Sequence, residues 1–440
     1  MTSVRTAEWA EPRRLRLATV AIVVFVIAGL ITHGTYAGAG DPPHYLMIAY
    51  SLAFDGDLEL ANNYAEHPAL IAGGTLEPEA HAIPGKDGRL RPVHDIGMPL
   101  IAAPIIRVLY PLAEWTGGAL PPELLRRTKM NAELILRHAL SLMMAVVAGF
   151  VALQIFELLR REGIADTRAM LWSLLMTLSP PLLSHSFLFF TEIPSALLVL
   201  WLVRTVSSGA LSPARGAAVG VGIGLLPLIH VRNIGFVIVL GPWVAMRLWR
   251  ARATSAGGWC AAAAAVPLAI RSAAQWTFWG TLLTSPHARP DWSLPVLTVI
   301  AQSLENLAGM FADRHVGLLI VAPIYLLAIP GFVLLFRRSS RIAMPVLVLS
   351  MTYVATVAIP WINVHGWTGG FAPAARMILP AVALLAIPVA IAADAARNVF
   401  RAAVVILVLL QVGIDGVMWN QPKRLWGGAQ STGPNQTDVP

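Results

Sequence analysis

Long apolar runs alternate with short polar segments along most of the chain. Eleven of these runs approach or exceed the roughly 20 residues that a helix needs to cross a bilayer. They occupy residues 17–35, 133–157, 168–187, 193–208, 214–230, 232–248, 257–279, 317–336, 342–360, 377–393 and 401–418. Hydrophobic residues make up 56% of the chain and charged residues 13%, too little charge to cover a soluble domain. The pattern predicts an all-α polytopic membrane protein with about 11 transmembrane helices.

A twelfth apolar stretch, residues 98–113, is shorter, and the arginine distribution decides how it is placed. Three arginines before the first run put the N-terminus in the cytoplasm. If 98–113 does not cross, the later arginine clusters all fall on the cytoplasmic side, and if it crosses they all fall outside. These clusters lie at 160–168, 247–252 and 337–341. We therefore predict that 98–113 is a helix lying in the outer interface.

The resulting organisation has a cytoplasmic N-terminus at 1–16, a transmembrane region at 17–418 and an external tail at 419–440. The transmembrane region includes one long external loop, residues 36–132, which carries interfacial helices. A cleaved signal peptide is the alternative for 17–39, but its apolar run is long for one. The net charge of +8 is scattered in short clusters between apolar runs, which indicates membrane topology and no nucleic-acid binding.

Histidines provide a second regularity. In this topology all 11 histidines of the chain lie in external loops or at the outer ends of spans. The topology was set from arginines alone, so the distribution of histidines is independent information. Polar groups at membrane depth are costly and are usually functional. We therefore expect a functional site at the outer face.

The external loop begins with an acidic residue at the membrane surface, in Gly40-Asp41-Pro42-Pro43-His44-Tyr45. A carboxylate there can act as a general base or bind a divalent cation. A helix N-cap or a salt bridge is the structural alternative. An interfacial amphipathic helix ending near Asp55 is predicted next, because one helical face collects Tyr45, Ile48, Ala49, Leu52 and Ala53.

Other charged residues are expected at the same outer surface. Glu192 begins the fourth apolar run and can pair with Asp41, although a carboxylate at a helix N-terminus is favourable by itself. Arg232, Arg314 and Arg376 lie at the outer ends of later runs. Arginine forks bind phosphate oxygens bidentately, whereas snorkelling to lipid headgroups is the structural alternative.

These residues resemble motifs of the GT-C superfamily of membrane glycosyltransferases, in particular the protein O-mannosyltransferases and the lipid A aminoarabinose transferases. The run Gly40 to Tyr45 resembles the acidic start of that family's first external loop. Glu192-Ile193-Pro194 resembles its acid-x-Pro motif, and Gly369-Gly370 through Arg376 resembles a motif of bacterial members.

The resemblance implies an inverting sugar transfer from a polyprenyl-phosphate donor to an external lipid, polysaccharide or protein acceptor. It places the reaction at the external, periplasmic face of the plasma (inner) membrane. Asp41 is expected to be the general base and Glu192 to orient the acceptor, while Arg376, Arg314 and Arg232 hold the donor phosphate. Further substrate-binding candidates are His44, Tyr45, His315 and His365. No residue is assigned as a metal ligand, and a divalent metal is left open as cofactor.

The alternative from another class is a membrane transporter or lipid flippase without glycosyl transfer. Such a protein needs polar residues deep in its spans and often has repeated halves. The predicted spans hold few polar residues, and no inverted repeat is evident. A non-catalytic scaffold is a third interpretation, which the gathering of polar residues at the outer face disfavours.

Overall fold

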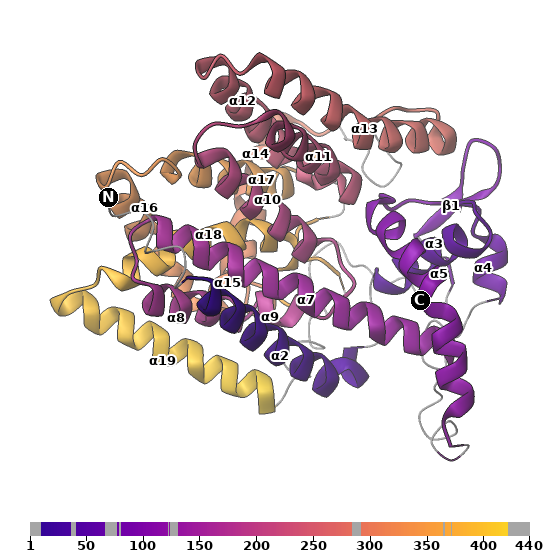
Figure 1. The fold of residues 1–440 in the computed structure, drawn as a ribbon, viewed down its shortest axis with the longest axis horizontal. Helices are drawn as coiled ribbons and strands as arrows, with labels where there is room; N and C mark the ends of the chain where they lie inside the picture. Colours follow the sequence, from indigo (N-terminus) through magenta and orange to yellow (C-terminus); the bar gives the residue numbers. More distant parts are fainter. Residues whose placement is uncertain are drawn as a thin grey trace.

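The computed structural model describes residues 10–36, 41–66, 77–78, 81–121, 123, 131–283, 292–363, 366–370 and 372–420. These residues are mostly helical (Figure 1), and helices occupy each of the eleven apolar runs. The elements concerned are α2 (Ala10–Tyr36), α7 (Ala132–Arg161), α8 (Asp166–Thr177), α9 (Leu182–His185), α10 (Glu192–Ser207), α11 (Pro213–Ile229), η2 (Val231–Asn233), α12 (Ile234–Arg250), α13 (Thr254–Trp279), α15 (Leu318–Val321), η4 (Pro323–Leu327), α16 (Ala328–Arg337), α17 (Ala343–Ala358), η5 (Arg376–Ile378), α18 (Leu379–Asp394) and α19 (Asn398–Asn420).

Within the described ranges, five helices are long and apolar enough to cross a membrane. They are Gly97–Ala119, Ala132–Arg161, Val231–Arg250, Arg376–Asp394 and Asn398–Asn420. The prediction of a mostly helical chain with several membrane-crossing candidates is confirmed, while the number of crossings stays a prediction. Gly97–Ala119 is α5, which contains the stretch expected to lie in the interface. It packs on α7 and runs across the direction of α2 and α7 in Figure 1.

The centre of the bundle is α18, whose residues Leu379–Ala393 are all buried except the partly buried Leu385. Its sequence is apolar all round, as expected of a helix with no face toward polar solvent, and it packs against α10, α16 and α17. By contrast, α19 is largely exposed along its length and is tied to the bundle by polar contacts. Asp415 accepts a hydrogen bond from Ser179 at 2.7 Å, and Gln411 donates to the Val321 carbonyl at 3.3 Å.

The loop between α2 and α7, which is predicted to be external, has a small core of its own and also packs on the main core of the bundle. Its elements are α3 (Pro42–Phe54), α4 (Ala61–Glu66), the antiparallel strands β1 (Ala82–Pro84) and β2 (Leu90–Pro92), and the start of α5. They gather at one end of α7 and α13 in Figure 1. The hairpin departs from the all-α prediction, because strands of three residues are too short to show a sequence period.

The helix predicted after Asp41 is present, and it ends at Phe54. Its amphipathic character was wrong, since residues 42–51 are buried on every side, while its position at the membrane interface stays a prediction. The reason is that α5 packs on one side of α3, while α4 and the hairpin cover another. The cluster between α3, α4 and the hairpin consists of Met47, Ile48, Leu60, Tyr64 and Ala82.

A further helix, α14 (Val296–Ala312), lies in a region that was expected to be a loop. It exposes four large apolar side chains, and polar residues interrupt its apolar pattern. A search for continuous apolar runs misses such a helix, whereas its 3.6-residue period could have revealed it. The exposed side chains are Val296, Leu297, Ile300 and Leu304.

Candidate functional site

Asp41, Glu192 and Arg376 form the centre of a buried polar cluster. Asp41 immediately precedes α3, Glu192 is the first residue of α10, and Arg376 is the first residue of η5. The Arg376 guanidinium donates from Nη2 to Asp41 Oδ2 and from Nε to Glu192 Oε1, the latter at 3.0 Å. The two acids that the sequence suggested as a pair are therefore joined by one arginine from a distant part of the chain.

The backbone before Arg376 holds its side chain in place. Gly369 has a φ of +85°, a conformation that favours glycine, and its carbonyl accepts a hydrogen bond from Arg376 Nη1 at 3.0 Å. Ala375 is also left-handed, with a φ of 57°. The guanidinium lies 4.0 Å from the centre of the Phe190 ring. With two carboxylates, a carbonyl and a ring as partners, the Arg376 side chain is restricted on several sides.

Arg232 is the second arginine of the cluster, and its hydrogen bonds are weaker. Its Nη2 lies 3.5 Å from Glu192 Oε1, and its Nη1 contacts the Met377 sulfur at 2.6 Å. A long contact and a thioether acceptor satisfy a guanidinium poorly. The Nε atom lies 3.4 Å from His230 Nδ1, and Nη2 lies 3.1 Å from His230 Nε2. Arg232 therefore has donors that a stronger anionic acceptor could take over.

Three histidines from the external loop lie beside Asp41. The ligand atoms of Asp41, His81 and His94 lie within 4.8 Å of one another. His81 Nδ1 and His94 Nε2 are 2.8 Å apart, and the His44 ring stacks on His81 at 3.7 Å. His44 Nδ1 also contacts the Tyr64 hydroxyl at 2.8 Å. Of this group, only Asp41 and His44 were singled out from the sequence.

Charge and burial set the protonation of the two groups nearest α3. Burial opposes the charge on Asp41, but Arg376, His94 and His81 outweigh it, and the pKa of this carboxyl is held well below its usual range. Burial and the neighbouring His81 lower the pKa of His44 to about 3. Asp41 is therefore ionised and His44 neutral at physiological pH.

Asp41, His81 and His94 could together hold a metal ion. Two imidazole nitrogens and one carboxylate oxygen form a donor set that suits zinc and similar divalent ions and leaves coordination positions open. The residues therefore fit a divalent metal. Asp41 belongs both to this set and to the cluster around Arg376, so the two share one carboxylate.

Several contacts attach the loop to the bundle. Next to His94, Asp95 accepts hydrogen bonds from Arg271 Nε at 2.9 Å and from the Val231 N–H at 2.6 Å. The Lys86 ammonium donates to the Trp276 carbonyl at 2.6 Å. These contacts join the histidine-bearing loop to α13 and to η2, which carries Arg232. Sequence analysis did not identify Asp95 or Arg271, because nothing in their local pattern marks them as partners.

Two buried polar atoms near the acids have no hydrogen-bond partner in the described part of the chain. These are the Tyr45 hydroxyl and His185 Nε2. His185 Nδ1 is 2.8 Å from the Pro181 carbonyl, so in a neutral ring Nε2 is the acceptor. Both residues are close enough to Glu192 and Arg376 to interact with their charges. Buried polar atoms of this kind usually bind water or a ligand.

The remaining sequence candidates lie elsewhere. Arg314 and His315 are exposed and contact each other, with 2.8 Å between Arg314 Nε and His315 Nε2. Within the described residues, no hydrogen bond or ion pair joins them to Asp41 or Glu192. Their loop still lies close to Arg376, because the Val316 carbonyl accepts from the Ala375 N–H at 2.9 Å. His365 lies outside the described residues.

Comparison with known proteins gives one distant likeness. No protein-family model and no curated protein matches the chain. Among solved structures, the chain is similar to the crystal structure of the Archaeoglobus fulgidus oligosaccharyltransferase in complex with Zn and sulfate. The sequence identity is 14%, the TM-score is 0.46, and the match covers 93% of this chain and 54% of that chain. This chain thus spans about half the length of that protein.

Proposed function

We propose that the chain is a GT-C-type glycosyltransferase that moves a sugar from a polyprenyl-phosphate donor to an external lipid, polysaccharide or protein acceptor. The observation that carries the proposal is the buried contact of Arg376 with both Asp41 and Glu192. Each of the three residues stands in a motif that resembles the GT-C superfamily. Their meeting in one cluster supports a common role for the three motifs.

The donor phosphate is assigned to the two arginines. Arg232 reaches its present partners through a long contact with Glu192, a sulfur atom and the ring of His230, so an anionic phosphate oxygen is a better acceptor for its fork. Arg376 is already bound by two carboxylates. A phosphate that binds Arg376 must compete with these carboxylates. When the phosphate displaces Asp41 from the guanidinium, the Asp41 oxygen that accepts from Arg376 becomes free.

The freed Asp41 carboxylate is the proposed general base. It accepts the proton of the acceptor hydroxyl as the acceptor oxygen bonds to the anomeric carbon. The bond from that carbon to the phosphate oxygen breaks, and polyprenyl phosphate leaves with the electron pair. Attack from the face opposite the phosphate inverts the anomeric configuration. Glu192 keeps Arg376 and Arg232 in place during the exchange.

A divalent metal is compatible with this scheme. Asp41, His81 and His94 are the residues that would hold it, and such an ion supplies electrostatic stabilisation to phosphate oxygens. The roles proposed for Arg376, Arg232 and Glu192 do not depend on it.

The test is transfer by the purified protein. Wild-type protein in detergent is incubated with radiolabelled polyprenyl-phosphate sugars and a membrane extract as the acceptor source, and release of polyprenyl phosphate is followed. Asp41→Asn should lose activity, while Glu66→Gln, which changes an exposed acid of the same loop, should keep it. If liposomes that contain wild-type protein move the labelled donor across the bilayer without cleaving it, the transporter alternative replaces this proposal.

A further inference from the structure

A second polar pocket lies at the other end of the bundle from Asp41. It has a volume of about 510 Å³ and lies between the ends of α7, α10, α16 and α17. Helix α10 runs from one site to the other, because it begins at Glu192 in the outer cluster and ends at Ser207 in this pocket. A helix of 16 residues is about 24 Å long. In the topology set by the arginines, the pocket faces the cytoplasm.

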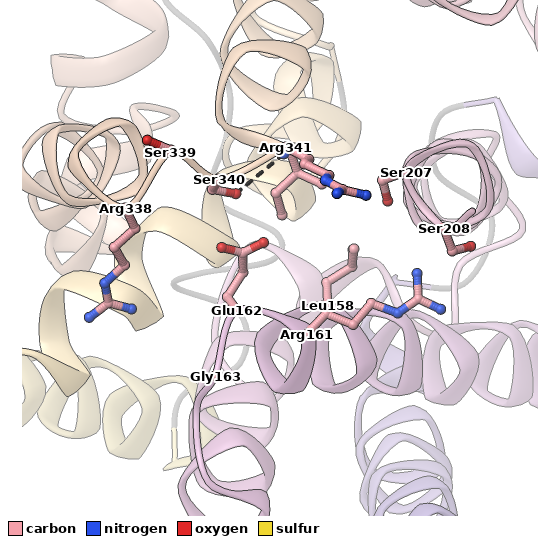
Figure 2. Close-up of a pocket in the computed structure, with 11 residues that line it drawn as sticks. Leu158, Arg161, Glu162, Gly163, Ser207, Ser208, Arg338, Ser339, Ser340 and Arg341 are labelled. Atoms are coloured by element: carbon pink, nitrogen blue, oxygen red, sulfur yellow. Dashed lines mark hydrogen bonds between the residues drawn. The ribbon is translucent and has the colours of Figure 1, made fainter. Parts of the chain in front are cut away.

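Basic and hydroxyl side chains line this pocket (Figure 2). In Figure 2, Arg341 extends toward the side of Ser207 and Arg161 toward the side of Ser208. Arg161 donates a hydrogen bond from Nη1 to the Arg204 carbonyl at 2.7 Å, and its side chain lines the pocket. Among the described residues, no carboxylate forms an ion pair with Arg341. Two guanidinium groups therefore line one space, whereas the hydroxyls of Ser207 and Ser208 beside them donate to the Val203 and Arg204 carbonyls of α10 at 2.7 and 2.9 Å.

The one acid that lines the pocket is already occupied. Glu162 interacts electrostatically with Ser340 and Arg338 and lies on the side of the pocket away from Ser207 in Figure 2. Its charge is thus balanced within its own half of the pocket. The half that contains Arg161 and Arg341 keeps an excess of positive charge.

Helix α17 adds to the positive potential of the pocket. Ile342, its N-cap residue, lines the pocket, so the positive end of a 16-residue helix opens at its edge. Helix N-termini favour negative groups, and arginine forks match phosphate oxygens in particular. The buried side chains of Leu158 and Ile342 give the pocket an apolar side, which suits a group that also carries hydrocarbon.

We propose that this pocket binds a phosphate group at the cytoplasmic face, through the guanidinium groups of Arg161 and Arg341. The phosphate is carried by an anionic phospholipid headgroup of the inner leaflet or by a soluble phosphorylated molecule. Both sources present the same chemistry to the two arginine forks, and the experiment distinguishes them. The site is separate from the outer cluster and does not depend on the function proposed for it.

The test compares Arg341→Gln with wild-type protein. Full-length delipidated protein is titrated with phosphatidylglycerol or phosphatidylcholine by native mass spectrometry, and with inorganic phosphate by calorimetry. The double variant Arg397→Gln/Arg401→Gln is the matched control, because both arginines are exposed and predicted to lie on the same membrane face. Arg341→Gln should weaken binding of phosphatidylglycerol or phosphate at least about tenfold, and the control should not.

The outcomes separate the two sources. If Arg341→Gln loses affinity for phosphatidylglycerol, the site binds a lipid. If it loses affinity for inorganic phosphate alone, the site binds a soluble ligand. Arg341→Lys keeps the charge and should lose less affinity than Arg341→Gln. Thermal unfolding without ligand checks that each variant is folded. If neither ligand binds wild type, or if both bind Arg341→Gln as tightly as wild type, the proposal is overturned.

Discussion

Replacing Asp41 by asparagine tests the proposed base with little change of shape. The Asp41 side chain makes no capping hydrogen bond to α3, so the substitution removes no helix cap. The asparagine oxygen can still accept from Arg376, whose charge remains opposed by Glu192 at 3.0 Å. What the variant loses is the negative charge, and with it the anionic member of the Asp41, His81 and His94 set, together with the ability to take a proton.

The expected magnitudes distinguish these losses. A charge-assisted hydrogen bond is about twice as strong as a neutral one, so the Arg376 contact weakens by about 1–2 kcal/mol. Loss of a general base lowers the rate about 10²–10⁴-fold, equivalent to about 3–5 kcal/mol of transition-state stabilisation. We expect kcat to fall at least about 100-fold. The donor KM should stay constant or decrease, because Arg376 loses one anionic competitor.

The assay is initial-rate release of polyprenyl phosphate over a range of donor concentrations, with Glu66→Gln as the control. Thermal unfolding of both variants should match that of the wild type within a few degrees. A wild-type kcat in folded Asp41→Asn protein would show that Asp41 has a structural role only. Glu192 would then have to be tested as the base.

Three other experiments test separate parts of the site and the topology. Arg376→Lys keeps the charge but loses the fork that joins its partners, so the donor KM should rise about tenfold or more; a wild-type KM would remove Arg376 from the phosphate site. His81→Ala and His94→Ala should each reduce zinc retained after gel filtration, measured by elemental mass spectrometry, and unchanged zinc would exclude the proposed ligand set. A membrane-impermeant thiol reagent applied outside should label Pro121→Cys but not Gly163→Cys, and the opposite pattern would refute the arginine-based topology.

The parts of the site that sequence could predict are those tied to the ends of apolar runs. Asp41, Glu192 and Arg376 each border such a run, and the charge distribution places these borders on one face. Topology therefore brings the three residues to the same level of the bundle without knowledge of helix packing. Their mutual contacts then depend on how α2, α10 and α18 pack, which the sequence pattern does not describe.

The histidine pair illustrates what could not be predicted. His81 and His94 flank a hairpin of two three-residue strands, and neither stands in a recognisable metal-ligand spacing. The only signal was the general placement of histidines outside the membrane. The burial of α3 was missed for a related reason, since its covering elements α4, β1 and β2 are short and lie later in the same loop.

The polar cluster around Arg376 contains residues from two parts of the chain, the predicted external loop and the helical bundle. Asp41, His81 and His94 come from the external loop with its own small core, whereas Glu192 and Arg376 come from the ends of bundle helices. The ion pair between Arg376 and Asp41 thus attaches the loop to the helical bundle and also belongs to the site. An anion that displaces Asp41 from Arg376 breaks this ion pair. The Asp95–Arg271 ion pair and the hydrogen bond from Lys86 to the Trp276 carbonyl are among the contacts that still hold the loop. In the proposed site, Arg376 therefore takes part both in anion binding and in the attachment of the loop to the bundle, which the other contacts maintain.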